Sequence, residues 1–212
     1  MHTTLLLIRH GETEWNTLGK FQGCKDINLT EEGIFQATLL NKKIQNSFDY
    51  IYTSPLKRAI DTSNIICANS SLKPEIYTNL REINFGKWEG LTLNEMKKLY
   101  PKEFQVWRND DKIAPLCGGD LSLKLASLRA KKAILDIIEK HKSKRIVVVT
   151  HGGLIRAGLI GLFDWKMTMY HKIVLGNTSI TKLKFDENLN PFIVTLNDTS
   201  HLPKNYTSKS LT

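Results

Sequence analysis

Leu5-Leu6-Leu7-Ile8-Arg9-His10-Gly11-Glu12-Thr13-Glu14-Trp15 is the stretch from which the rest of the chain can be interpreted. Its apolar start predicts a short buried strand, and Arg9 and His10 stand where that strand ends, followed by a Gly11 that allows a sharp turn. In open α/β sheets, ligands bind in the crevice beyond the carboxyl ends of the strands. An Arg-His pair there is suited to holding and attacking an anion, although such a pair also arises by chance on loops.

Composition and cysteine content favour one globular domain in a reducing compartment. The chain has 212 residues, 41% hydrophobic and 24% charged, which is ordinary for a well-packed domain. No apolar run reaches the roughly 20 residues of a membrane span, and the N-terminus lacks a signal-peptide pattern. Three irregularly spaced cysteines, Cys24, Cys67 and Cys117, fit neither a disulfide framework nor a zinc site. We expect a cytoplasmic protein with no membrane association, no metal and no cofactor.

The net charge of +9 is compatible with nucleic acid, an anionic membrane surface or an acidic small molecule as partner. Most basic residues stand where helix ends are predicted, which is where lysine and arginine favour the helix dipole. No basic run is interleaved with aromatic residues, and no nucleic-acid-binding motif is present. We therefore expect a small phosphorylated substrate rather than nucleic acid. Whether the protein is a monomer or a homodimer is left open.

Strands and helices alternate along the chain. Apolar and alternating runs predict strands at 4–8, 49–53, 75–78, 145–150, 178–185 and 192–197. Helices are predicted at 30–47, after Ser54-Pro55 with Ser54 as N-cap, from Thr92 towards Pro101, at 121–141 and at 154–163. This order predicts right-handed β-α-β crossovers. The expected fold is α/β, with three layers (α/β/α) and a mostly parallel central sheet.

Residues 80–120 interrupt this pattern and are interpreted as an inserted lid. Gly86 and Gly90 break regular structure, and four large aromatic residues stand in the segment: Phe85, Trp88, Phe104 and Trp107. We expect the segment to fold over the crevice and these aromatics to favour a partly apolar leaving group. The predicted organisation is therefore a single domain over residues 1–202, with the lid at about 80–120, followed by a polar tail at 203–212.

Three strand ends bring chemically specific side chains to one edge of the predicted sheet. Arg9-His10 follow the first strand, Arg58 lies in the helix after the second, and His151 follows the β-branched strand at 145–150. Arginine forks bind phosphate oxygens in pairs and stay charged. A neutral imidazole can attack phosphorus and form a phosphohistidine. Glu82, at the entrance of the lid, is our candidate for the acid that protonates the leaving group.

These residues also carry a family resemblance. Leu7-Ile8-Arg9-His10-Gly11-Glu12-Thr13 resembles the signature of the histidine phosphatase superfamily, the phosphoglycerate mutase-like proteins. Four further motifs of that family follow in order: Ser54-Pro55-Leu56-Lys57-Arg58-Ala59, Glu82 with Phe85-Gly86-Lys87-Trp88-Glu89-Gly90, Thr150-His151-Gly152-Gly153, and Asn177-Thr178-Ser179. The match runs from residue 5 to about 202. One such motif is weak evidence, whereas five in order are strong.

The resemblance implies a role for each residue of the site. His10 would be the nucleophile that becomes phosphorylated, and Arg9, Arg58 and His151 would hold the phosphoryl group. Glu82 would protonate the leaving group and later activate water. The expected substrate-binding residues are Asn16, Gln22, Gly23 and Gly152. Asn16 can also be interpreted as an amide that only stabilises its loop, and for Gln22 this structural interpretation is the favoured one.

Two points of the resemblance leave alternatives open. Gly118-Gly119-Asp120-Leu121 stands where family members often carry Gly-Glu-Ser, so the family's glutamate role does not transfer directly to Asp120. Glu89 is a second carboxylate in the same loop as Glu82 and is its rival as the acid.

The leading hypothesis is a metal-independent phosphomonoesterase that works through a phosphohistidine on His10. The resembling phosphatase branch includes α-ribazole-5′-phosphate phosphatases and broad-specificity phosphatases, so α-ribazole-5′-phosphate is a candidate substrate. A cofactor-dependent phosphoglycerate mutase is the first alternative, disfavoured by the Phe-Gly-Lys-Trp-Glu-Gly pattern at 85–90 and by the absence of the longer insertions usual in mutases. A non-catalytic phosphate-ligand binding protein is the second.

Overall fold

The sheet is mixed and has the order β3-β2-β4-β1-β5-β6 in the computed structural model, which describes residues 2–203. Its strands are β1 (Thr3–Arg9), β2 (Tyr50–Thr53), β3 (Glu75–Ile76), β4 (Arg145–Thr150), β5 (Ile180–Phe185) and β6 (Pro191–Asp198). β1 pairs parallel with β4, and β2 pairs parallel with both β3 and β4. β5 pairs antiparallel with both of its neighbours, β1 and β6, so among the described residues it is the one strand that runs opposite to the others. The mostly parallel sheet predicted from the sequence is confirmed.

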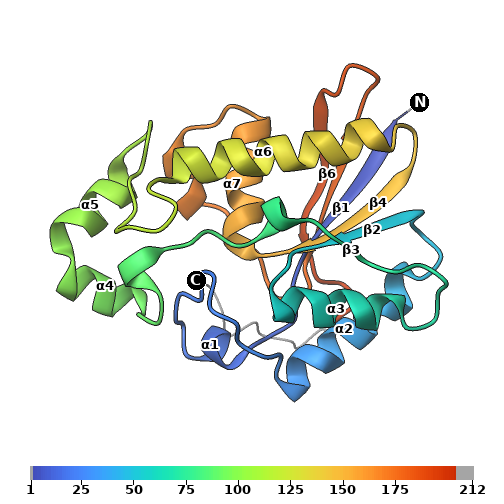
Figure 1. Ribbon diagram of the computed structural model, residues 1–212, viewed down its shortest axis with the longest axis horizontal. Coiled ribbons are helices and arrows are strands. Elements are labelled where there is room, and N and C mark those ends of the chain that lie inside the picture. The colour runs from blue at the N-terminus through green and yellow to red at the C-terminus, as the bar shows by residue number, and fades with distance from the viewer. Residues whose placement is uncertain (1, 204–212) are drawn as a thin grey trace.

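Helices cover both faces of this sheet (Figure 1). α2 (Glu31–Ile44) and α3 (Lys57–Cys67) lie on one side, and α6 (Leu123–Lys140) and α7 (Gly152–Leu162) on the other. Side chains of a strand point alternately to its two faces. Leu5 and Leu7 of β1 accordingly join the buried cluster under α6 and α7, whereas Ile8 joins the cluster under α2 and α3. The three-layer architecture is confirmed.

Side chains that accept backbone N–H groups set the start of several helices. Thr30 Oγ1 accepts from Gly33 N at 3.0 Å at α2, and Ser122 Oγ accepts from Leu125 N at 3.2 Å at α6. The prediction that Ser54 caps α3 is wrong. That helix begins at Lys57, and Ser54 Oγ accepts instead from Leu56 N within the preceding turn. Ser54 is thereby left at the end of β2, facing the sheet edge.

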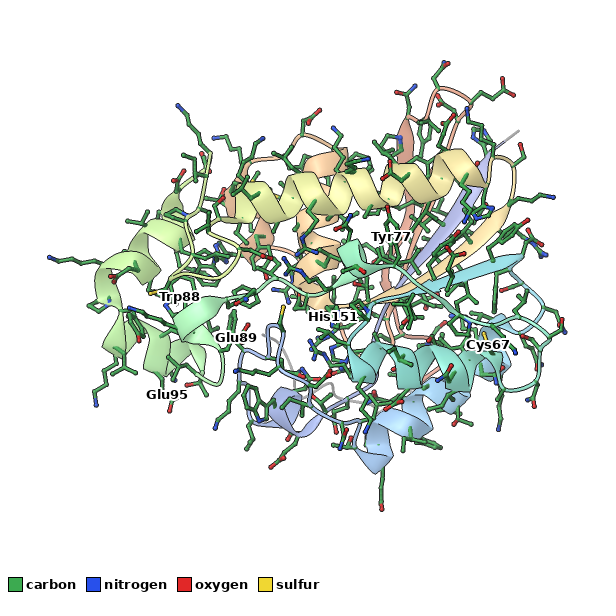
Figure 2. The ribbon with its side chains drawn as sticks, in the orientation of Figure 1. Cys67, Tyr77, Trp88, Glu89, Glu95 and His151 are labelled. Carbon is green, nitrogen blue, oxygen red and sulfur yellow. The ribbon has the colours of Figure 1, made fainter. Side chains whose placement is uncertain are left out.

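The segment at 80–120 contains α4 (Leu93–Leu99), α5 (Pro101–Asn109) and a short 3-10 turn, η2 (Gly86–Trp88). Two other 3-10 turns, η1 (Thr78–Leu80) and η3 (Met167–His171), and the short α1 (Glu14–Thr17) complete the elements. Trp88 and Trp107 are fully buried in an aromatic cluster that also includes Ala126 of α6 and Ala157 of α7. α4 and α5 extend beyond the end of the sheet, and Trp88 lies among them (Figures 1 and 2). The segment is therefore packed onto the main layers through a shared core.

Two further expectations concern the ends of the chain and the membrane. The polar tail predicted at 203–212 lies outside the described residues except for Pro203. Within residues 2–203, each helix is too short or too polar to cross a lipid bilayer.

Candidate active site

A cleft of about 470 Å³, its open mouth included, lies beyond the carboxyl ends of β1 and β4. Eight of the nine predicted site residues line it: Arg9, His10, Asn16, Gln22, Gly23, Arg58, Glu82 and Gly152. The ninth, His151, is not among the lining residues, but its ring centroid is 5.2 Å from that of His10, which does line the cleft. Strands that end at one edge of the sheet thus bring together residues from five separate parts of the chain.

His10 presents one ring nitrogen as a hydrogen-bond acceptor. Its Nδ1 lies 2.7 Å from the carbonyl oxygen of Gly11, which can only accept, so Nδ1 carries the proton. Nε2 then holds a lone pair, and Arg58 Nε donates to it at 3.2 Å. Burial lowers the pKa of His10 well below its usual value, and the positive charges of Arg58 and Arg9 lower it further. The imidazole is therefore neutral at neutral pH.

Two buried guanidinium groups flank this imidazole. Arg58 Nη1 donates to the Lys25 carbonyl at 2.7 Å, and its Nη2 donates to the Gly23 carbonyl at 2.8 Å. Arg9 Nη1 donates to the Leu175 carbonyl at 2.5 Å, and burial lowers the pKa of Arg9 to about 10. Both side chains stay cationic at neutral pH, so the cleft offers fixed positive charge to an anion.

His151 immediately precedes α7 and lies near the middle of the molecule (Figure 2). Its Nε2 is hydrogen-bonded to Ser54 Oγ at 2.7 Å, and its Nδ1 is buried without a hydrogen-bond partner among residues 2–203. Burial, with Arg58 and His10 nearby, lowers the pKa of His151 well below its usual value. Ser54 thus orients the second histidine, a role that sequence reasoning missed.

Glu82 is the carboxylate that reaches the cleft. Its Oε1 accepts from Ile83 N at 2.8 Å and its Oε2 accepts from Gly153 N at 3.0 Å, at the positive end of α7. The rival Glu89 is used differently, because its Oε1 accepts from Cys24 N at 3.0 Å and from Phe85 N at 3.3 Å. Glu89 does not line the cleft.

The two amides of the first loop differ in their surroundings. Asn16 Oδ1 accepts from Thr13 N, Thr13 Oγ1 and Asn177 Nδ2, all within 3.1 Å, which matches the interpretation that this amide stabilises its loop. Gln22 is only 7% exposed, yet its Oε1 has no hydrogen-bond partner among residues 2–203. A buried amide oxygen without a partner is costly, and the residue that carries it is one of those that line the cleft.

The two predicted glycines allow close backbone approach. Gly23 has a φ of +51°, and a Cβ there would lie 1.9 Å from Glu89 Oε1. At Gly152 a Cβ would meet the Arg9 side chain at 3.4 Å.

The cleft also contains residues that were not predicted: Lys20, Phe21, Gly153, Arg156 and Tyr170. Lys20 and Phe21 directly precede Gln22, and Arg156 lies one helical turn after Gly152, so sequence spacing could have found them. Tyr170 comes from η3 and carries no signal in the sequence. Of the four aromatics expected to face the leaving group, Phe85 alone lines the cleft. Trp88, Phe104 and Trp107 pack in the aromatic cluster instead, so the prediction is wrong for those three.

Comparison with known proteins agrees with this geometry. A family model for the histidine phosphatase superfamily (branch 1) matches residues 5–199. A crystal structure of a phosphoserine phosphatase mutant from Entamoeba histolytica in complex with phosphoserine has a TM-score of 0.89 and 38% sequence identity, covering 95% of this chain and 100% of that chain.

Curated relatives carry two kinds of name. Phosphoserine phosphatase 1 of Hydrogenobacter thermophilus is 32% identical over 203 residues, which are 95% of each protein. A 2,3-bisphosphoglycerate-dependent phosphoglycerate mutase of Bartonella henselae is 35% identical over 171 residues, covering 76% of this chain and 82% of that protein. Because the family model spans nearly the whole chain and the relatives match over most of its length, the chain belongs to the histidine phosphatase superfamily (branch 1) and is a phosphatase of that family.

Proposed function

We propose that the protein is a metal-independent phosphoric monoester hydrolase that works through a phosphohistidine on His10, with phosphoserine as its preferred substrate. The observation that carries the proposal is the state of His10, a buried neutral imidazole whose Nε2 lone pair lies in a cationic cleft. Phosphoryl transfer requires mainly positioning and charge stabilisation, both of which this cleft can supply.

In the first step, Arg9, Arg58 and His151 hold the phosphoryl oxygens while His10 Nε2 attacks phosphorus. The bond between phosphorus and the ester oxygen breaks, and Glu82 gives its proton to the departing alkoxide. The hydrogen bond from His10 Nδ1 to the Gly11 carbonyl stabilises the positive charge that develops on the ring. The products of this step are the free alcohol and a phosphohistidine.

In the second step, water hydrolyses the phosphohistidine. Glu82, now a carboxylate, takes a proton from the water as its oxygen attacks phosphorus. The bond between phosphorus and Nε2 breaks, and inorganic phosphate leaves, so that Glu82 is protonated again and His10 is neutral.

The lining of the cleft supports a small zwitterionic leaving group. Lys20 and Arg156 add positive charge that suits a carboxylate, and the unpartnered Gln22 Oε1 suits an ammonium group. Phosphoserine supplies both groups on a leaving alcohol of three carbons. Relatives named phosphoserine phosphatase in two organisms, one with phosphoserine bound, support the same choice.

α-Ribazole-5′-phosphate is the second substrate candidate, because its aromatic base would stack on Phe21 and Phe85, which both line the cleft. A mutase would use the same phosphohistidine and return the phosphoryl group to a sugar acid. Relatives with the mutase name do not favour that reaction over hydrolysis, since relatives with the phosphatase name match as well.

We further propose that residues 80–120 act as a lid, because this segment supplies Glu82 and Phe85 to the cleft. Cys24, Cys67 and Cys117 are free thiols, which suits the reducing cytoplasm expected from the sequence.

The test is an assay of the purified protein on p-nitrophenyl phosphate and phosphoserine with EDTA present. We expect phosphate release by the wild type and a loss of at least about a thousandfold in His10→Ala, an increase of about 4 kcal/mol in the activation barrier. A quench at high pH should trap phosphohistidine in the wild type only. His171→Ala, which removes a histidine outside the cleft, is the matched control. Equal release by His10→Ala and wild type would contradict the proposal.

A substrate panel tests the finer choice. We expect kcat/KM for phosphoserine to exceed that for α-ribazole-5′-phosphate by at least about tenfold, a difference of about 1.4 kcal/mol in transition-state binding. The reverse order would assign the second candidate. Sustained interconversion of 2- and 3-phosphoglycerate without net phosphate release would assign the mutase.

A further inference from the structure

Asp120 lies between two guanidinium groups outside the cleft. Its carboxylate accepts a paired contact from Arg81, with Nη2 to Oδ1 at 2.6 Å and Nη1 to Oδ2 at 3.0 Å. Arg129 of α6 donates through Nη2 to the same Oδ2 at 3.0 Å. The side chain of Asp120 is 13% exposed and that of Arg129 is 15% exposed. The three groups form an ion cluster, called here the Asp120 clamp.

The Asp120 clamp forms hydrogen bonds with the backbone on both sides of Glu82 and at Glu82 itself. Arg81 Nη1 donates to the Glu82 carbonyl at 3.1 Å, and Arg129 Nη2 donates to the same oxygen at 3.3 Å. Arg129 Nη1 also donates to the Arg81 carbonyl at 2.8 Å. Asp120 Oδ2 accepts from Asn84 N at 3.1 Å, two residues beyond Glu82. Four contacts therefore converge on the short stretch 81–84.

The Glu82 carboxylate depends on where that stretch lies. It reaches Gly153 N at 3.0 Å across the gap between the 81–84 stretch and α7. Residues 81–83 belong to no helix or strand, so no ladder of backbone hydrogen bonds fixes them. On the near side, Thr150 Oγ1 donates to the Leu80 carbonyl at 2.7 Å. After Leu80, the Asp120 clamp is the charged group that holds the 81–84 stretch in place.

We propose that Asp120 is a positioning residue that holds Glu82, through Arg81 and Arg129, where Glu82 can protonate the leaving group. The inference rests on the proposed role of Glu82 as general acid. It gives a function to the carboxylate whose role the family resemblance left open.

The negative charge of Asp120 explains why an asparagine at this position would not do the same work. Burial disfavours its charge, but hydrogen bonds from Arg81 and Asn84 hold the pKa of Asp120 below its usual value, so it is ionised at working pH. In Asp120→Asn, one oxygen becomes an NH₂ group that cannot accept from Arg81. Two half-buried cations would then face each other without an anion, and the 81–84 stretch would lose its anchor.

The test compares phosphoserine with p-nitrophenyl phosphate, two substrates whose leaving groups differ in whether they need a proton from a general acid. Serine leaves as a poor alkoxide that must be protonated, whereas p-nitrophenolate leaves without a proton. Because kcat/KM covers the steps up to departure of the leaving group, it separates the two cases. We expect Asp120→Asn to lower kcat/KM for phosphoserine by about tenfold or more relative to that for p-nitrophenyl phosphate, about 1.4 kcal/mol. Asp120→Glu should restore most of the ratio.

The ratio of two substrates on one enzyme preparation is independent of the fraction that is folded. A merely structural Asp120 would therefore lower both values equally, and this result would overturn the inference, as would no change in either. If Asp120→Asn does not fold, Arg129→Lys should show the same selective loss to a smaller extent, and an unchanged ratio in that variant would overturn the inference. Asp136→Asn is the control, since Asp136 also pairs with a cation of α6, Lys132, but at the exposed surface.

Glu82→Gln separates this inference from the proposed function. It should show the largest selective loss on phosphoserine. If Glu82→Gln is selective and Asp120→Asn is not, the inference fails alone. If Glu82→Gln lowers kcat/KM equally for phosphoserine and for p-nitrophenyl phosphate, the proposed role of Glu82 as general acid fails.

Discussion

His10 owes its neutral state to its nearest neighbours. A carbonyl oxygen beside Nδ1 fixes one tautomer, and two guanidinium groups in a buried site disfavour a third positive charge. Arg58 contributes twice, because it lowers the pKa of His10 and donates to Nε2. The residue that binds phosphate in the proposed mechanism thus also keeps the nucleophile unprotonated.

This coupling predicts a pKa change at one residue. Removing the cation in Arg58→Met should raise the pKa of His10, since a like charge no longer opposes protonation. NMR of protein labelled with ¹⁵N-histidine reports the midpoint and tautomer directly. At pH 6.5, where half of an ordinary histidine is protonated, wild-type His10 should remain in the neutral Nδ1–H form. Lys57→Met, which removes a neighbouring exposed cation, should leave the midpoint unchanged. A downward shift in Arg58→Met would refute the coupling.

At the scale of the element, α7 begins with glycines because Glu82 must approach its N-terminus. A Cβ at Gly153 would lie 2.6 Å from Glu82 Oε1 and 2.8 Å from Tyr170 Oη. Both contacts are closer than real Cβ atoms show. The helix can therefore donate its N–H group to the carboxylate only while residue 153 lacks a side chain.

Gly153→Ala should lower kcat/KM for phosphoserine by about tenfold or more, about 1.4 kcal/mol, because the added methyl displaces the Glu82 carboxylate. The matched variant is Gly158→Ala in the same helix. There the nearest atom is Ile134 Cδ1 at 2.9 Å, the far end of a flexible side chain, and alanine gains about 1 kcal/mol of helix propensity. Gly158→Ala should thus retain activity. Steady-state kinetics measure kcat/KM for phosphoserine, and thermal unfolding shows whether each variant is folded. An equal loss of kcat/KM in both variants would rule out the steric explanation.

The elements themselves were largely predictable. Buried strands such as β1 and β4 are continuous apolar runs, and an N-cap such as Thr30 acts within four residues, so local sequence suffices. Strand ends then predicted which residues share the sheet edge. Tertiary contacts overrode local chemistry at Ser54, where a serine-proline start suggests an N-cap but the hydroxyl is engaged by His151.

Contacts between distant loops were beyond sequence reasoning. Whether an aromatic in the 80–120 segment faces the cleft, as Phe85 does, or the shared core, as Trp88 does, depends on how that segment packs on α6 and α7. The Asp120 clamp likewise joins residues 39 and 9 positions apart, with no motif that links them. Tyr170 reaches the cleft only because η3 folds back on α7.

At the scale of the whole molecule, the burial of histidines makes the free energy of unfolding depend on pH. Burial is the largest cause that lowers the pKa of five histidines among residues 2–203: His10, His141, His151, His171 and His201. For the last two the pKa falls to about 4. His171 Nε2 is hydrogen-bonded to the Trp107 carbonyl, and His201 Nε2 to Thr178 Oγ1, so both bonds exist only in the folded protein, and neither histidine lines the cleft.

These shifts predict that the protein loses stability on mild acidification. An unfolded chain protonates its histidines near pH 6.5, whereas the folded protein does not until lower pH. The unfolded state therefore binds more protons in this window, and the stabilisation is complete above pH 6.5 and is lost as pH falls towards 4. Each such group contributes up to about 1.4 kcal/mol per pH unit, and we expect a decline of at least about 2 kcal/mol between pH 7 and 5. Urea unfolding at a series of pH values measures it. A His171→Gln, His201→Asn double variant should flatten the slope. A free energy of unfolding that rises on acidification would show that the folded protein takes up its protons first.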